Sequence, residues 1–99
     1  MLKEKRNFQE DHMKAVITVI GKDSVGILAK VSTACAEAGA NVAEVTQSVL
    51  DKYFAMIMMV DIDNMTCSIE ELKGNIEAGV PAMTVHVMHE DIFNSMHRI

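Results

Sequence analysis

The sequence predicts an α+β domain, a two-layer sandwich in which two helices cover one face of a four-stranded antiparallel sheet and a short helix follows at the C-terminus. Four short runs are β-branched or alternate apolar and polar residues, and two longer runs repeat apolar residues every three or four positions. They follow the order β-α-β-β-α-β. A chain of 99 residues with 49% hydrophobic residues can bury one modest core.

The first strand is expected over residues 14–20, because KAVITVI is short and rich in β-branched residues. A four-residue turn follows, bracketed by Gly21 and Gly26. Glycine adopts conformations that other residues avoid, and it lets another molecule approach the backbone closely. The turn is therefore the first candidate for a site.

The first helix is expected from Ser24 to Ala38, with Asp23 or Ser24 capping its start and Gly39 suiting its end. Its length follows from the helical spacing of an apolar stripe. That stripe consists of Ile27, Leu28, Val31, Ala34, Cys35 and Ala38.

The middle of the domain is predicted to be a hairpin. Residues 41–50 alternate as in a half-buried strand, and Asp51 and Lys52 turn the chain into a strand over residues 53–62. Both faces of this third strand are mostly apolar, although helices are expected on one side of the sheet only. We therefore expect the C-terminal helix or a second subunit to cover the rear face. The alternative is a central strand whose rear face is apolar and partly exposed.

The last third of the chain is predicted to contain a helix, a strand and a helix. The helix over residues 68–78 begins with Ser68 and Glu71, which have the spacing of a capping box. Alternation predicts a strand over residues 82–89, and helical spacing predicts an amphipathic helix over residues 90–99.

Composition argues against several classes of function. The net charge of -5, with Arg6 and Arg98 as the two arginines, disfavours nucleic acid as a partner. We find no signal peptide and no apolar run long enough to span a membrane, which indicates a cytoplasmic protein that binds no membrane. Cys35 and Cys67 lack metal-ligand spacing, and Cys35 is predicted to be a buried small apolar residue.

No constellation typical of a catalytic centre is recognisable, so we expect no enzymatic activity and no cofactor. An acylphosphatase of this strand order needs an arginine in its first loop, where this chain has only Lys22. His86, His89 and His97 raise the question of a metal site. We expect none, because His86 and His89 should point to opposite faces of a strand.

Residues 1–12 contain few apolar residues and show no periodicity, so the domain is expected over residues 13–99. Residues 9–11, Gln-Glu-Asp, can be encoded by a purine run, AGGAGG, that resembles a ribosome-binding site just before Met13. Two interpretations stay open. Residues 1–12 are either a translated leader or a disordered N-terminal extension.

The stretch over residues 13–60 resembles an ACT domain, the small regulatory module that binds amino acids. More narrowly, the chain looks like the short single-domain UPF0237 proteins, which are related to the glycine-cleavage-repressor type. The resemblance is carried by the G-x-D-x-x-G-I turn, the AGANV helix exit and the QSVLDKYFAM hairpin. It covers roughly residues 13–99, and it implies a ferredoxin-like fold and a bacterial, regulatory protein.

The resemblance also implies a ligand site at a subunit boundary, where Asp23 faces an ammonium group and Asn41 offers its amide. The helix start would favour a carboxylate, because its N–H groups are unpaired. Many ACT turns have Arg-Pro where this chain has Ser24-Val25, which leaves the ligand open. The candidate ligand-binding residues are Gly21, Lys22, Asp23, Ser24, Val25, Gly26, Ile27 and Asn41.

Two functions remain open at this point. In the first, the chain is a homodimer that senses a small amino acid, and a regulated protein partner reads the arrangement of the subunits. In the second, the ACT-like fold dimerises and docks another protein without a ligand. A sensor should lose its response on Asp23→Ala or Asn41→Ala while staying folded, whereas an interaction module should ignore both changes.

Overall fold

The computed structural model describes residues 13–22 and 25–96. The predictions for residues 1–12, Asp23, Ser24 and His97 lie outside these ranges. In chain order the elements are β1 (Lys14–Gly21), α2 (Ile27–Ala38), β2 (Asn41–Leu50), β3 (Tyr53–Asp61), α3 (Ile69–Gly79), β4 (Thr84–His89) and α4 (Glu90–Met96).

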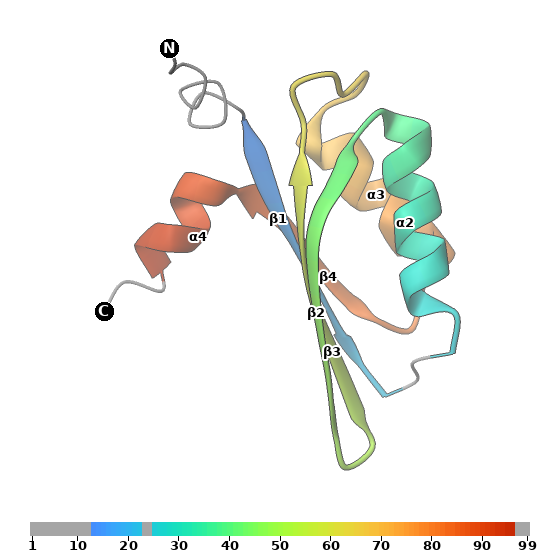
Figure 1. Cartoon of the computed structure of the whole chain (residues 1–99). Helices are drawn as coiled ribbons and strands as arrows, with labels where there is room; N and C mark the ends of the chain where they lie inside the picture. Colours follow the sequence, from blue (N-terminus) through green and yellow to red (C-terminus); the bar gives the residue numbers. More distant parts are fainter. Residues whose placement is uncertain (1–12, 23–24, 97–99) are drawn as a thin grey trace.

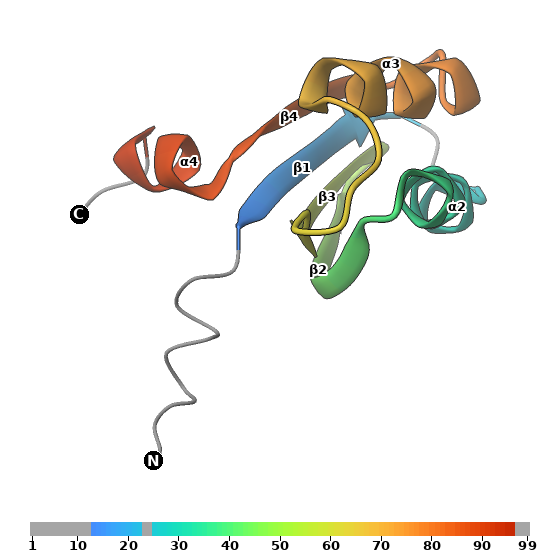
Figure 2. The same ribbon diagram turned by 90° about the horizontal axis from the view of Figure 1, so that it is seen from above.

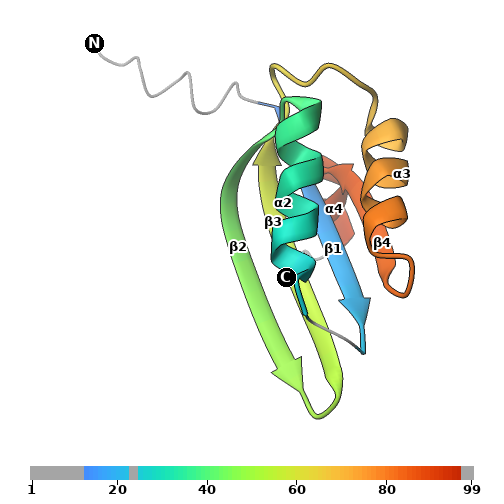
Figure 3. The ribbon, with the colours of Figure 1, turned by 90° about the vertical axis from the view of Figure 1, so that its right-hand side faces the viewer.

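The predicted fold class is confirmed. The strands form one antiparallel sheet in the order β2-β3-β1-β4, which is the ferredoxin-like arrangement. Helices α2 and α3 cover one face of the sheet, and α4 lies on the opposite side (Figures 1 and 2). Figure 3 shows α2 and α3 side by side in front of the strands.

The core lies between the sheet and the helix pair. Every second residue of β1 and β3 points into it, as the period of a strand requires. Cys35 is fully buried there, as predicted, and this burial raises the pKa of its thiol to about 11. The buried side chains include Ala15, Ile17, Val19, Val31, Phe54, Met56, Met58, Val60, Leu72 and Ile76.

The rear face of the sheet is only partly covered. Helix α4 lies against β1 and β4, so the predicted cover by the C-terminal helix is present over that half. On β3, Ile57 and Tyr53 remain 44% and 48% exposed. Apolar surface is therefore left open beside α4.

Strand β2 differs from the half-buried strand that was predicted. Val45 is its one half-buried residue, and the others are exposed. The reason is its place in the sheet: β2 is an edge strand, and a bulge between Val42 and Glu44 interrupts its alternation. Both faces of β2 are therefore exposed along most of its length.

Helix α2 begins three residues later than predicted, at Ile27, and its N-cap residue is Gly26. The cap position thus belongs to Gly26, and the predicted capping residues, Asp23 and Ser24, lie outside the described ranges. Gly26 takes a left-handed conformation, with φ 71°, which ends the turn sharply before the helix. At the other end, Gly39 is the C-cap as expected, with φ 81°.

Helix α3 begins with the predicted capping box. The Ser68 hydroxyl accepts a bond of 3.1 Å from the Glu71 N–H, and the Glu71 carboxylate accepts one of 3.0 Å from the Ser68 N–H. We expect Ser68→Ala to lower the free energy of unfolding by about 1 kcal/mol, measured by urea denaturation, because the Glu71 N–H loses its acceptor. Ser68→Thr, which keeps the hydroxyl, should lose much less. Equal losses would contradict the cap's contribution.

Candidate functional site

The candidate turn joins the end of β1 to the start of α2. Gly21 is the last residue of β1 and lies opposite Phe54, while Lys22 is exposed in the loop. Val25 precedes the helix with 80% of its side chain exposed. Asp23 and Ser24 lie outside the described residues, so their proposed contacts rest on the sequence alone.

The two glycines of the turn are present for different reasons. A Cβ at Gly21 would overlap the sulfur of Met83 and lie 2.9 Å from its Cε, so this glycine makes room for packing. At Gly26 the nearest atom to such a Cβ is the Lys30 Cε at 4.0 Å. Gly26 is thus required by its positive φ, and the space above its backbone is open.

The start of α2 offers unpaired backbone donors. The first bond of the helix runs from the Lys30 N–H to the Gly26 carbonyl at 3.0 Å, so the N–H groups of Ile27 and Leu28 have no acceptor within the helix. In the described part of the chain no side chain caps this end, and the first turn of the helix contains no acidic residue. The partial positive charge of a helix start favours an anionic group.

A shallow hollow of about 120 Å³ lies beside the turn. The Ile27 side chain is 5% exposed and belongs to the core, so only its backbone can meet a ligand. This volume is well below the roughly 300 Å³ at which ligand pockets begin. The lining residues are Val25, Ile27, Lys30, Gly79, Val80, Pro81, Ala82 and Met83.

Asn41 is not brought near the turn within one chain. It is exposed at the start of β2 and lies opposite Asp61, whereas Gly21 lies opposite Phe54. The seven residue steps from Phe54 to Asp61 span roughly 23 Å of strand. The candidate residues therefore form two groups, at opposite ends of the sheet.

The histidines of β4 are separated as the sequence predicted. His86 lies opposite Thr18 and His89 opposite Ala15, which places them on opposite faces of the strand. Across residues 13–22 and 25–96, no group of three or more His, Cys, Asp and Glu side chains is arranged to hold a metal ion. Among the helices of the same ranges, none is both long and apolar enough to cross a bilayer.

Comparison with known sequences identifies the family. The ACT domain model matches residues 14–88. A UPF0237 protein of Clostridium perfringens (strain 13 / Type A) is 47% identical over 89 residues, which cover 88% of this chain and 100% of the relative. One of Methanocaldococcus jannaschii is 43% identical and covers 87% of this chain and 98% of the relative. The chain belongs to the ACT domain family, a family of regulatory domains, and within it to the UPF0237 group.

Solved structures agree with this assignment. An ACT domain protein from Streptococcus pneumoniae superimposes with a TM-score of 0.70 at 36% identity, over 84% of this chain and 96% of that chain. The regulatory subunit of aspartate kinase from Thermus thermophilus gives 0.60 at 28% identity, over 77% of this chain and 51% of that one. Both structures share the fold of this chain.

Proposed function

We propose that this ACT domain is a non-enzymatic sensor of a small amino acid, which it binds where two copies of the chain meet. The observation that carries the proposal is the open backbone at Gly26, directly beside the unpaired N–H groups that begin α2. This is the turn at which ACT domains are expected to hold their ligand.

Two copies are needed because one chain separates the turn from Asn41. The exposed edge strand β2 offers a way to join them. If two β2 strands pair antiparallel about a two-fold axis near their middle, Asn41 of one copy lies level with the end of β2, and hence with the turn, of the other. Such pairing also satisfies the open edge, which otherwise invites unwanted association.

In this arrangement the ligand is recognised as a zwitterion. Its carboxylate accepts bonds from the N–H groups at the start of α2, and Asp23 supplies a negative charge for its ammonium group. The amide of Asn41, from the second copy, completes the polar contacts. The hollow of about 120 Å³ beside Val25 leaves space for a small side chain only.

The alternative is a ligand-free module that dimerises and docks another protein. One observation favours it: Val25, at the tip of the turn, is apolar and 80% exposed. In the sensor, by contrast, the ligand must bind one arrangement of the two copies more tightly than another. Otherwise it does not change the populations of the two arrangements, and a partner protein has no difference to recognise.

The experiment is a thermal-melt screen of the full chain against the twenty amino acids at millimolar concentration. A ligand present at about a hundred times its dissociation constant adds about 2.7 kcal/mol of stability, which raises the midpoint by several degrees in a domain of this size. Asn41→Ala and Asp23→Ala should each remove the response of the folded protein. Asn75→Ala, on the exposed side of α3, should keep it.

The outcomes separate the two candidates. One amino acid that raises the midpoint in the parent chain and in Asn75→Ala, but not in Asn41→Ala, supports the sensor. If no amino acid raises the midpoint, the sensor proposal is wrong and the interaction module is the function that is left.

A further inference from the structure

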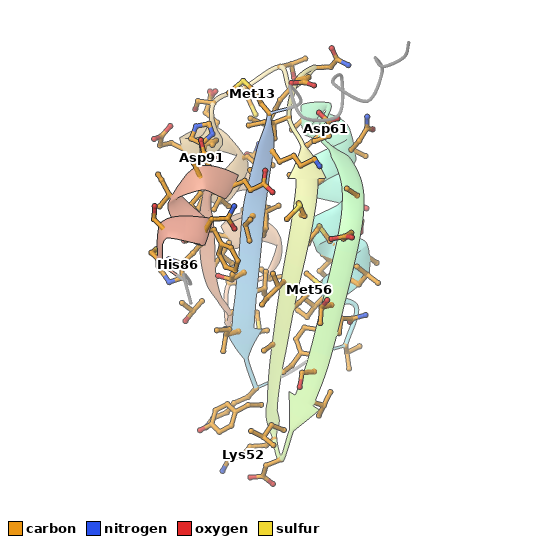
Figure 4. The ribbon with its side chains drawn as sticks, turned by 60° about the vertical axis from the view of Figure 1, so that its left-hand side comes forward. Met13, Lys52, Met56, Asp61, His86 and Asp91 are labelled. Carbon is orange, nitrogen blue, oxygen red and sulfur yellow. The ribbon has the colours of Figure 1, made fainter. Side chains whose placement is uncertain are left out.

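A second hollow lies on the rear face of the sheet, between the strands and α4. We call it the rear slot; its volume is about 350 Å³. Figure 4 shows α4 lying across this side of the sheet, with His86 beside it. The residues lining the slot are Thr18, Ile20, Ala55, Met56, Ile57, His86, Met88, Phe93 and Met96.

The slot leaves α4 weakly supported. This helix has seven residues, and none of them is buried. A helix so short is not stable by itself in water, so it depends on packing against β1 and β4. Met96 remains 63% exposed and Ile20, on the floor, 48%. A molecule in the slot would bury apolar surface of α4 and of the sheet at the same time.

The lining specifies the charge of the occupant. None of the nine described residues around the slot is Asp, Glu, Lys or Arg, although 23% of the chain is charged. A charged ligand would lose its hydration here without gaining a partner. The polar side chains are Thr18 and His86, which lie directly opposite one another on β1 and β4. Together they offer one small hydrogen-bonding patch.

The lining also favours a ring. Met88 and Met96 place flexible thioethers around the slot, and Phe93 adds an aromatic side chain. Sulfur and aromatic groups both pack favourably against an aromatic ring. A volume of about 350 Å³ holds roughly twelve non-hydrogen atoms, if each takes the share of a water in the liquid.

We propose that the rear slot binds an uncharged aromatic molecule of about two-ring size, whose single hydrogen-bonding group contacts Thr18 and His86. This site is separate from the turn at the start of α2, and it lies over β1, β3 and β4 rather than at the β2 edge. Occupancy holds α4 against the sheet.

Indole and 1-methylindole are the probes, because they differ in the ring N–H donor. Backbone amide shifts of the full chain are followed by NMR while each probe is titrated. Indole should shift residues of the slot saturably, with a dissociation constant on the order of 1 mM. 1-Methylindole should bind several-fold more weakly. Thr18→Val should lower the affinity for indole to that for 1-methylindole. Thr46→Val, on the same face of the sheet but outside the slot, should leave the affinity for indole unchanged.

Ala55→Leu provides the second test, because its larger side chain fills the floor of the slot. It should abolish the indole shifts, and Ala36→Leu on the exposed side of α2 should leave them unchanged. Shifts that do not saturate, or that persist in Ala55→Leu, overturn the proposal. The proposal is also overturned if a second copy of the chain closes the slot. In that case indole causes no shift in the parent chain, and Ile57→Lys lowers the mass measured by light scattering. The amino-acid response at the turn should be unaffected by Ala55→Leu, so the two proposals fail independently.

Discussion

Leu72→Ala is expected to lower the free energy of unfolding by about 2–5 kcal/mol, the range for deleting a fully buried leucine side chain. Leu72 is 0% exposed, and with Ile76 it is one of the two residues by which α3 is buried against the sheet. Removing three carbons there leaves a cavity below the first turn of the helix. Helix α3 packs against α2 and β4, and closely packed side chains relax only partly into such a cavity.

Urea denaturation measures this loss directly. A domain of this size has about 5–15 kcal/mol of stability in total, so the midpoint of thermal unfolding should fall by about 10 °C or more. Asn75→Ala, an exposed change in the same helix, should stay within about 0.5 kcal/mol of the parent. A loss below 1 kcal/mol for Leu72→Ala would mean that α3 is not packed as described.

Gly39→Ala is expected to cost about 2 kcal/mol or more, for two reasons that add. Gly39 has φ 81°, and a residue with a Cβ in the left-handed region loses about 1–2 kcal/mol. The new Cβ would also lie 2.8 Å from the carbonyl oxygen of Asn64, a backbone atom that cannot swing aside. Both penalties fall on the exit of α2, where the chain turns into β2.

Gly74→Ala is the matched control, because the same chemical change should have the opposite sign. Gly74 lies within α3, and a Cβ there would meet nothing within 4 Å. Alanine is the better helix former by about 0.5–1 kcal/mol, so this variant should gain that amount. Calorimetry or urea denaturation of both variants checks the pair. A gain, or no change, at Gly39 would contradict its assigned conformation.

Helical spacing located α2 and α3, and the capping box of Ser68 and Glu71 was predictable from spacing alone, because such local bonds form in any helix with those residues. The start of α2 was predicted too early. Asp23 and Ser24 are good capping residues, but the left-handed conformation of Gly26 ends the turn closer to Ile27.

The candidate site was only partly accessible to sequence reasoning. Gly21 and Gly26 look alike in the sequence, yet one makes room for Met83 and the other leaves its backbone open. Met83 lies more than sixty residues from Gly21 along the chain, so no local pattern connects them. The rear slot was not predicted either. Its one signal was the apolar rear of β3, which indicated cover without indicating an unfilled space.

By itself, the sequence determined the order of the elements, the stripe that each helix buries, and a permissive turn before α2. These follow from the periods of helices and strands and from the conformations open to glycine, which depend on neighbouring residues only. Tertiary structure decided that β2 is an exposed edge, that Asn41 lies at the opposite end of the sheet from the turn, and that α4 stands over a slot. Those features depend on which strands pair and in what register, and pairing joins residues that are distant in the chain.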